Sequence, residues 1–150
     1  MGTPMTLNAE AAAALAEDAA TLALLHDTEL TPSVLAGLKE AGFPANLGLL
    51  PAGPASEGSF EMMRTALASL PDSPDAAQLD ELAADFAAIY LTSAYGASPN
   101  ESFWLSDDHL VCQDAMFDLR ELYAENGLAV PDWRKRPDDH LVFQLQFFAR

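Results

Sequence analysis

The chain has 150 residues, the length of one domain, and half of them are hydrophobic, enough to form a core. No window approaches about 18 uninterrupted apolar residues, which excludes a transmembrane helix. Seven basic residues against 23 acidic ones give a net charge of −16, which argues against nucleic acid as a partner and favours basic or apolar partners.

Helical periodicity predominates in the first half of the chain, and clusters of proline and glycine separate the predicted helices. Residues 9–26 form an alanine-rich amphipathic segment. Thr31 followed by Pro32 is typical of an N-cap and a first helical turn, and Gly42 ends this second helix. Residues 43–58 are predicted to be a loop, and residues 59–70 the next helix.

A capping box defines the helix that follows. Asp75 and Gln78 have the spacing of that motif, and the apolar stripe behind them runs to Tyr90. Residues 92–104, which contain Gly96 and Pro99, are predicted to be irregular.

Ser106 is predicted to cap the longest helix, which ends at Gly127. Cys112 falls inside that helix and is expected in the core. As the single cysteine it excludes an internal disulfide and fits a reducing compartment. After a loop over residues 131–137, a last helix is predicted to start at Asp138.

These elements predict an all-α fold, a single-domain helical bundle of about six or seven helices over residues 1–150. The last helix reaches Arg150 without a stop signal, so we expect the natural domain to continue with further C-terminal helices. Its apolar face (Phe143, Phe147 and Phe148) then lacks a cover. We therefore expect self-association, as a homodimer that exchanges helices.

The pattern Asp-Asp-His-Leu-Val occurs twice, at residues 107–111 and 138–142. Acidic residues ahead of an apolar stripe are typical of helix starts, which is the favoured interpretation of both copies. A metal site built from two Asp–His pairs is the alternative. Consecutive helical residues point about 100° apart and no His-x3-His pair is present, so we expect no metal.

Other catalytic motifs are missing from the sequence. No serine has a Gly-x-Ser-x-Gly context, and no phosphate-binding loop is present. Arg134, Lys135 and Arg136 form the one basic run, which is either a solvated loop or a patch that receives an anion. Composition and spacing alone indicate an acidic, all-helical domain.

The second half of the chain contains four motifs in order, FAAIY, PNESFW, LYAENGL and PDDHL. Together they resemble the TorD/DmsD family of molybdoenzyme maturation chaperones, which includes NarJ-like proteins. Residues 86–90 read FAAIY, similar to an aromatic-x-x-Leu-Phe segment of the family. Residues 99–104 read PNESFW, similar to its Pro-x-Glu-Ser-aromatic loop. Residues 122–128 read LYAENGL, like Tyr-x-x-x-Gly-Leu, and residues 137–141 read PDDHL, like the Glu-Pro-x-Asp-His hallmark.

The resemblance implies a cytoplasmic binding protein with no catalytic activity and no cofactor. Its implied partners are an apo-molybdoenzyme and the twin-arginine signal peptide of that enzyme, which an acidic protein with an aromatic groove complements. Carried over to matching positions, the implied peptide- and partner-binding residues are Phe86, Ile89, Tyr90, Pro99, Ser102, Trp104, Asp139 and His140.

Asp139 is expected in the first turn of the last helix, where free N–H groups stabilise its ionised carboxylate. Two positions depart from the family pattern, because Arg136 and Gln144 stand where the family has glutamate. Two alternatives stay open. One is a helical nucleotide-binding or hydrolytic enzyme that uses Asp139 and His140, and the other is a plain acidic protein-interaction domain.

Overall fold

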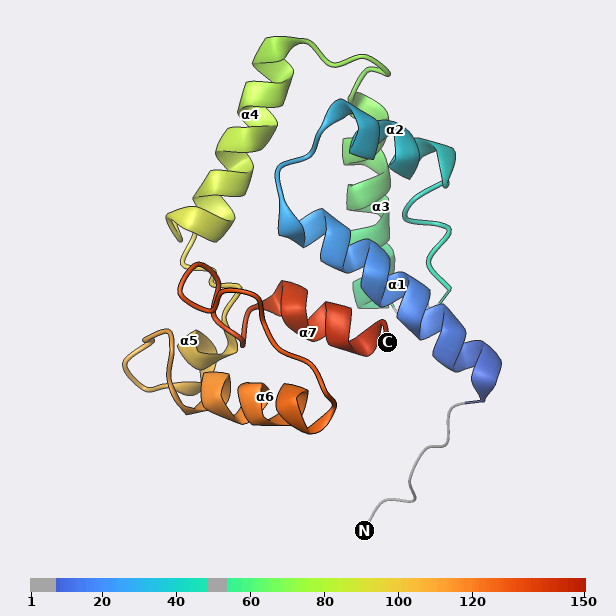
Figure 1. Ribbon diagram of the computed structural model, residues 1–150. Coiled ribbons are helices and arrows are strands. Elements are labelled where there is room, and N and C mark those ends of the chain that lie inside the picture. Colours follow the sequence, from blue (N-terminus) through green and yellow to red (C-terminus); the bar gives the residue numbers. More distant parts are fainter. Residues whose placement is uncertain (1–7, 49–53) are drawn as a thin grey trace.

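The computed structural model describes residues 8–48 and 54–150, and within these ranges it contains helices and no strand (Figure 1). The prediction of an all-α fold with six or seven helices is confirmed. The helices are α1 (Ala9–Asp27), α2 (Pro32–Glu40), α3 (Pro54–Ser69), α4 (Ala76–Phe86), α5 (Glu101–Leu105), α6 (Asp114–Glu125) and α7 (Leu141–Phe148), and a π-helical turn η1 (Ala87–Leu91) continues α4.

Local capping chemistry sets the starts of two helices where the sequence predicted them. The Thr31 hydroxyl accepts from the backbone N–H of Val34, and Pro32 occupies the first turn of α2. Asp75 and Gln78 form the reciprocal capping box of α4. Gly127, with a φ of 71°, follows the last turn of α6 in the left-handed conformation that favours glycine.

Two predicted irregular stretches contain helix. The helix expected from residue 59 starts at Pro54, because proline is compatible with a first helical turn and does not break it there. Of the predicted loop 43–58, residues 49–53 lie outside the described part. Within the predicted irregular stretch 92–104, the chain forms the first turn of α5.

The predicted helix start at Ser106 is wrong, because the helix begins at Asp114 and is shorter than α1. Ser106 instead accepts from the backbone N–H of Leu110 and closes a loop. His109 and Cys112 have φ values of 52° and 59°, which no α-helix accommodates. Cys112 therefore lies in a loop, half-buried, and not in a helix.

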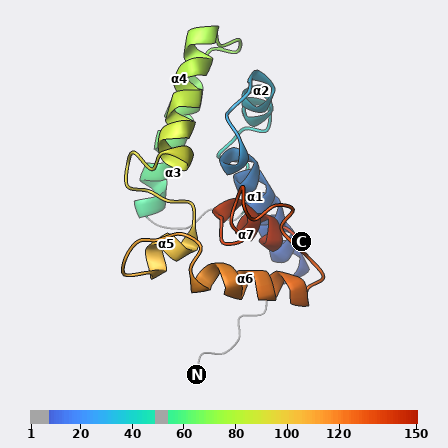
Figure 2. The same ribbon diagram turned by 60° about the vertical axis from the view of Figure 1, so that its left-hand side comes forward.

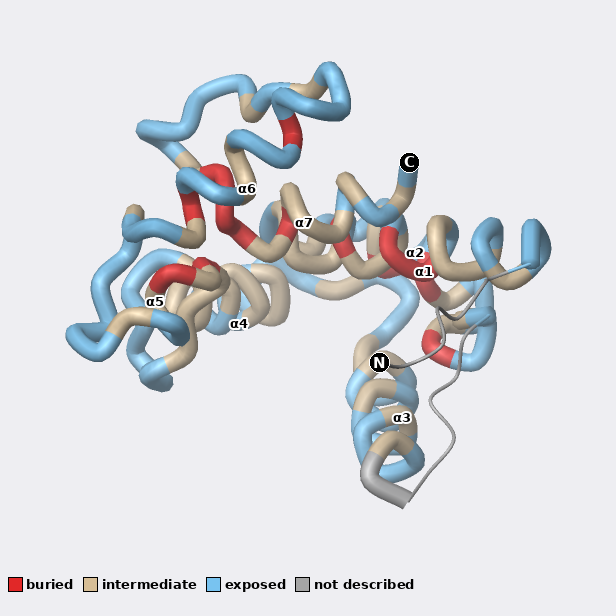
Figure 3. The backbone as a smooth tube through the Cα atoms, turned by 90° about the horizontal axis from the view of Figure 1, so that it is seen from below, coloured by how far each residue is buried: buried red, intermediate tan, exposed pale blue. Residues whose placement is uncertain are grey.

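Most of the buried hydrophobic side chains lie on α1, α6 and α7, and the others lie on α2 (Figures 2 and 3). α1 packs along α7, and the Tyr123 ring on α6 contacts the Phe147 ring on α7, with centroids 5.2 Å apart. Tyr123 is buried, and burial raises its pKa to about 12. The buried hydrophobic side chains are Ala19, Ala23, Leu35, Leu38, Met116, Tyr123 and Val142.

Polar contacts hold the connecting segments onto the helices. The Arg136 guanidinium binds both the carboxylate and the carbonyl oxygen of Asp27, which joins the loop before α7 to the end of α1. The backbone N–H of Gly48 donates to Asp18, 2.8 Å away, and a Cβ at Gly48 would lie 2.9 Å from the Cβ of Ala14. Glycine therefore allows the chain to pass close to α1 at this point.

Other surfaces of the molecule are thinly covered. None of the described side chains of α3 and α4 is buried, and α3 projects from the rest of the structure in Figure 3. On α7, Phe148 is exposed, whereas Phe143 and Phe147 are half-buried. Self-association through this face stays a prediction.

No helix in the described ranges has the length and apolar character needed to cross a membrane.

Met116 tests the location of the core. Met116→Ala is expected to lower the free energy of unfolding by about 2–5 kcal/mol, because Met116 is fully buried and its removal leaves a cavity. The same substitution at the exposed Met62 of α3 is the control, and is expected to change stability by less than about 0.5 kcal/mol. Urea denaturation measures both, and equal losses would contradict this core.

Candidate functional site

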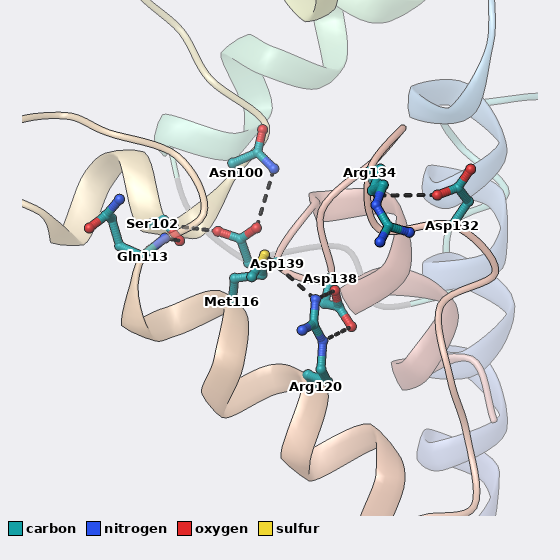
Figure 4. Close-up of polar contacts among 9 residues, drawn as sticks. All are labelled: Asn100, Ser102, Gln113, Met116, Arg120, Asp132, Arg134, Asp138 and Asp139. Atoms are coloured by element: carbon teal, nitrogen blue, oxygen red, sulfur yellow. Dashed lines mark hydrogen bonds and ion pairs between the residues drawn. The ribbon is translucent and has the colours of Figure 1, made fainter.

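The carboxylate of Asp139 is fully buried and binds the start of α5 (Figure 4). One oxygen accepts from the backbone N–H of Ser102 at 2.7 Å, and the other accepts from the side-chain amide of Asn100 at 3.3 Å. Ser102 belongs to the first turn of α5, where backbone N–H groups have no partner within the helix. Asp139 thus caps a helix 37 residues earlier in the chain.

The expected position of Asp139 in the first turn of the last helix is therefore wrong. α7 begins at Leu141, and Asp139 precedes its N-cap, His140. The helix predicted from Asp138 starts late because both aspartates have partners elsewhere. Asp138 is buried and forms a two-point ion pair with Arg120 of α6, with N···O distances of 3.1 and 2.7 Å.

Backbone contacts join the same two segments. The N–H of Glu101 donates to the carbonyl of Asp139 at 3.1 Å, and the N–H of Leu141 donates to the carbonyl of Pro99 at 2.8 Å. Gln144 donates to both the Glu101 carboxylate and the Asp139 carbonyl. An amide at position 144 can donate to Glu101, whereas a glutamate would place a second negative charge beside it.

His140 caps α7 with its ring. Its Nδ1 accepts from the backbone N–H of Val142 at 3.1 Å, which requires that this nitrogen carry no proton. Burial, and then the nearby Arg136 guanidinium, lower the pKa of His140 from 6.5 to about 4. The ring is therefore neutral at physiological pH.

A pocket of about 190 Å³ lies beside this cap and brings together four of the eight predicted site residues. The rings of Phe86 and Tyr90 lie 4.6 Å apart, and Tyr90 is hydrogen-bonded to Nδ1 of His26. The pocket is lined by His26, Phe86, Tyr90, Leu91, Pro99, Asn100, Lys135, Arg136, Pro137 and His140.

The other four predicted residues do not line this pocket. Asp139 and Ser102 are buried and hydrogen-bonded to each other, which makes them structural supports of the pocket wall. Ile89 is half-buried in η1. Trp104 is exposed on α5, where its indole N–H donates to the carbonyl of Ser98.

Six lining residues were not among the predicted site residues, and the side chains of two of them, His26 and Asn100, make hydrogen bonds to predicted ones. His26, at the end of α1, reaches Tyr90 across 64 positions of sequence, and no local pattern marks it. Burial lowers the pKa of His26, so its ring also favours the neutral form. Asn100 has a local signal, since it lies within the PNESFW segment, yet its role as a donor to Asp139 depends on tertiary packing.

The basic run is paired within the chain. Arg136 binds Asp27, and the Arg134 guanidinium lies 5.0 Å from the centre of the Trp133 ring. Lys135 and Arg136 border the pocket, whereas no aspartate or glutamate of the described residues lines it. The pocket thus has a mixed lining, in which aromatic and proline side chains face polar and basic ones. No group of three or more metal-ligating side chains occurs in the described ranges.

The two copies of Asp-Asp-His-Leu-Val have different structures, so the interpretation of both as helix starts is wrong for the first copy. His109 is exposed in a left-handed loop conformation, and its Nδ1 is bonded to the carbonyl of Phe103. His140 is buried at the start of α7. The difference comes from packing, since the local sequence is the same.

Asp139→Asn is expected to lower the free energy of unfolding by about 2–3 kcal/mol, because an amide cannot accept from both buried donors. Asp108→Asn is the matched control, since Asp108 holds the same place in the exposed first copy, and its effect is expected below about 0.5 kcal/mol. Thermal or urea unfolding compares the two. Equal stabilities would contradict the capping role.

His140 is expected to make the fold sensitive to acid. The unfolded chain binds a proton near pH 6.5 and the folded chain near pH 4, so stability falls as pH decreases between these values. His140→Asn keeps a capping side chain without a titrating group. The loss of stability between pH 7 and 5 is expected to be about 2 kcal/mol smaller in this variant. Parallel pH profiles would contradict the assignment.

Comparisons with known proteins agree on one family. The model of the family described as "Nitrate reductase delta subunit" matches residues 56–150. The "Chaperone protein TorD" of Vibrio parahaemolyticus serotype O3:K6 (strain RIMD 2210633) is 36% identical over 125 residues, which cover 83% of this chain and 51% of that protein. The protein of the same name from Vibrio atlanticus (strain LGP32) is 31% identical over 98 residues, 61% of this chain and 46% of the relative.

The chain spans about half the length of these curated relatives. No solved structure matches it. The family match covers the Asp139 contacts and every pocket-lining residue except His26. The chain therefore belongs to the nitrate reductase delta subunit family, the NarJ/TorD family, as the resemblance of its motifs predicted.

Proposed function

We propose that this chain is a cytoplasmic maturation chaperone, which binds the apo form of a molybdenum-cofactor oxidoreductase and its twin-arginine signal peptide. The observation that carries the proposal is the pocket beside His140. Phe86, Tyr90, Pro99 and His140 come from three separate family-like segments and line one cavity. The relatives named as chaperones support the same role.

The chemistry of the pocket suits the apolar part of a signal peptide. Two aromatic rings in contact and Pro99 provide apolar surface, and the His140 ring beside them is neutral. Apolar side chains that enter such a pocket lose contact with water, which favours binding. Lys135 and Arg136 border the pocket and no described carboxylate lines it, so an arginine would find no anionic partner there.

The contacts of Asp139 and His140 support a binding role over a hydrolytic one. Asp139 is engaged with Ser102 and Asn100, and the accepting nitrogen of His140 is engaged with Val142. A general acid–base pair needs the carboxylate to orient the ring, and no hydrogen bond joins these two side chains in the described structure. The proposed function requires no bound cofactor.

Tyr90→Ala tests the pocket. The variant is expected to bind a twin-arginine signal peptide about tenfold more weakly than the unaltered chain, because it removes one of the two aromatic rings. Tyr95→Ala, at an exposed position that does not line the pocket, is the matched control and is expected to leave the affinity unchanged. Tryptophan fluorescence during a peptide titration measures both dissociation constants.

Circular dichroism is used to check that each tyrosine variant is folded. Tyr90→Phe, which keeps the ring, is expected to retain most of the affinity for the peptide. If the unaltered chain binds no such peptide, the proposed function is wrong. If Tyr90→Ala and Tyr95→Ala bind equally well, peptide binding does not involve this pocket.

A further inference from the structure

A second surface lies on the other side of α5, between α5 and the first turns of α6. We define the α5–α6 face by Leu105, Ser106, Asp114, Ala115 and Asp118. An open groove of about 280 Å³ runs along it and is lined in part by these residues. Leu105 is 69% exposed, so a large apolar side chain lines the groove without cover.

The two carboxylates of this face, Asp114 and Asp118, form no ion pair within the described residues. Asp114 and Asp118 lie one turn apart on α6, a spacing at which like charges repel. Residues 101–125 contain seven acidic residues and one basic residue, Arg120, which is committed to Asp138.

An apolar groove with two adjacent, unneutralised carboxylates complements a segment that carries guanidinium groups beside apolar side chains. A guanidinium placed between carboxylates one turn apart makes charge-assisted hydrogen bonds and removes their mutual repulsion. The pocket beside His140 has the opposite character, since its edge is cationic and no described carboxylate lines it. The two surfaces therefore differ in charge, with carboxylates at the groove and basic side chains at the pocket.

The two surfaces meet at one short stretch of chain. Pro99 and Asn100 line the pocket, and Leu105, at the end of α5, lines the groove. Figures 1 and 2 show α5 between the end of α4, which supplies the pocket, and α6, which supplies the groove. We propose that the α5–α6 face binds the arginine-bearing part of the signal peptide, while the pocket holds its apolar part. This proposal rests on the proposed function.

The test uses a double variant, Asp114→Asn with Asp118→Asn, and two peptides. One is a twin-arginine signal peptide, and the other has both arginines replaced by glutamine. The unaltered chain is expected to prefer the arginine peptide by about tenfold at low salt, and the double variant to bind both peptides alike. Asp80→Asn with Glu81→Gln, at exposed positions of α4, changes the net charge equally and is expected to keep the preference.

Circular dichroism checks the fold of each variant. If the loss of Asp114 disturbs the start of α6, the single variant Asp118→Asn replaces the double variant in the peptide titrations. A preference for arginine that survives in the double variant overturns the α5–α6 assignment and leaves the proposed function intact. A preference lost equally in the α4 control also overturns it, since overall charge then explains the effect.

A third probe separates this inference from the proposed function. A peptide of alternating leucine and arginine lacks the signal-peptide motif but has the chemistry that the face accepts. If the unaltered chain binds no signal peptide but binds this probe through Asp114 and Asp118, the proposed function fails and the surface assignment stands. If neither peptide binds, both are wrong.

Discussion

The burial of one carboxylate organises the functional half of this protein. Asp139 lies in the interior, and its oxygens are accommodated there because the backbone of Ser102 and the amide of Asn100 donate to them. The same contact holds α5 against the segment before α7. The pocket wall formed by Pro99, Asn100 and His140 exists because these two segments are held side by side.

Helix starts were predictable where the cap and its partner are neighbours in sequence. Thr31 and the Asp75–Gln78 pair satisfy N–H groups of their own helices, and the structure has both. Ser106 and Asp138 carry similar local signals, but their side chains bind other groups, Leu110 within a loop and Arg120 on another helix. Local patterns therefore fail where another partner, in a neighbouring loop or on another helix, competes for the same polar atom.

The motifs predicted which residues lie close together better than they predicted the contacts of each residue. They placed Phe86, Tyr90, Pro99 and His140 in one region, and all four line the pocket. Spacing alone does not distinguish a residue that lines a pocket from a residue that supports its wall, which is why Asp139 was expected among the partner-binding residues. His26 reaches the pocket through the packing of α1, for which the sequence contains no signal.

The uneven burial of the helices gives the two walls of the pocket different local stabilities. Phe86 and Tyr90 stand on α4 and η1, which contain no buried side chain, whereas His140 and Asn100 belong to the hydrogen-bonded interior. Segments with few buried contacts open at a lower free-energy cost than the global unfolding of the chain. Amide hydrogens of α4 are therefore expected to exchange with solvent sooner than those of α7, and the aromatic wall is expected to be the more adjustable of the two.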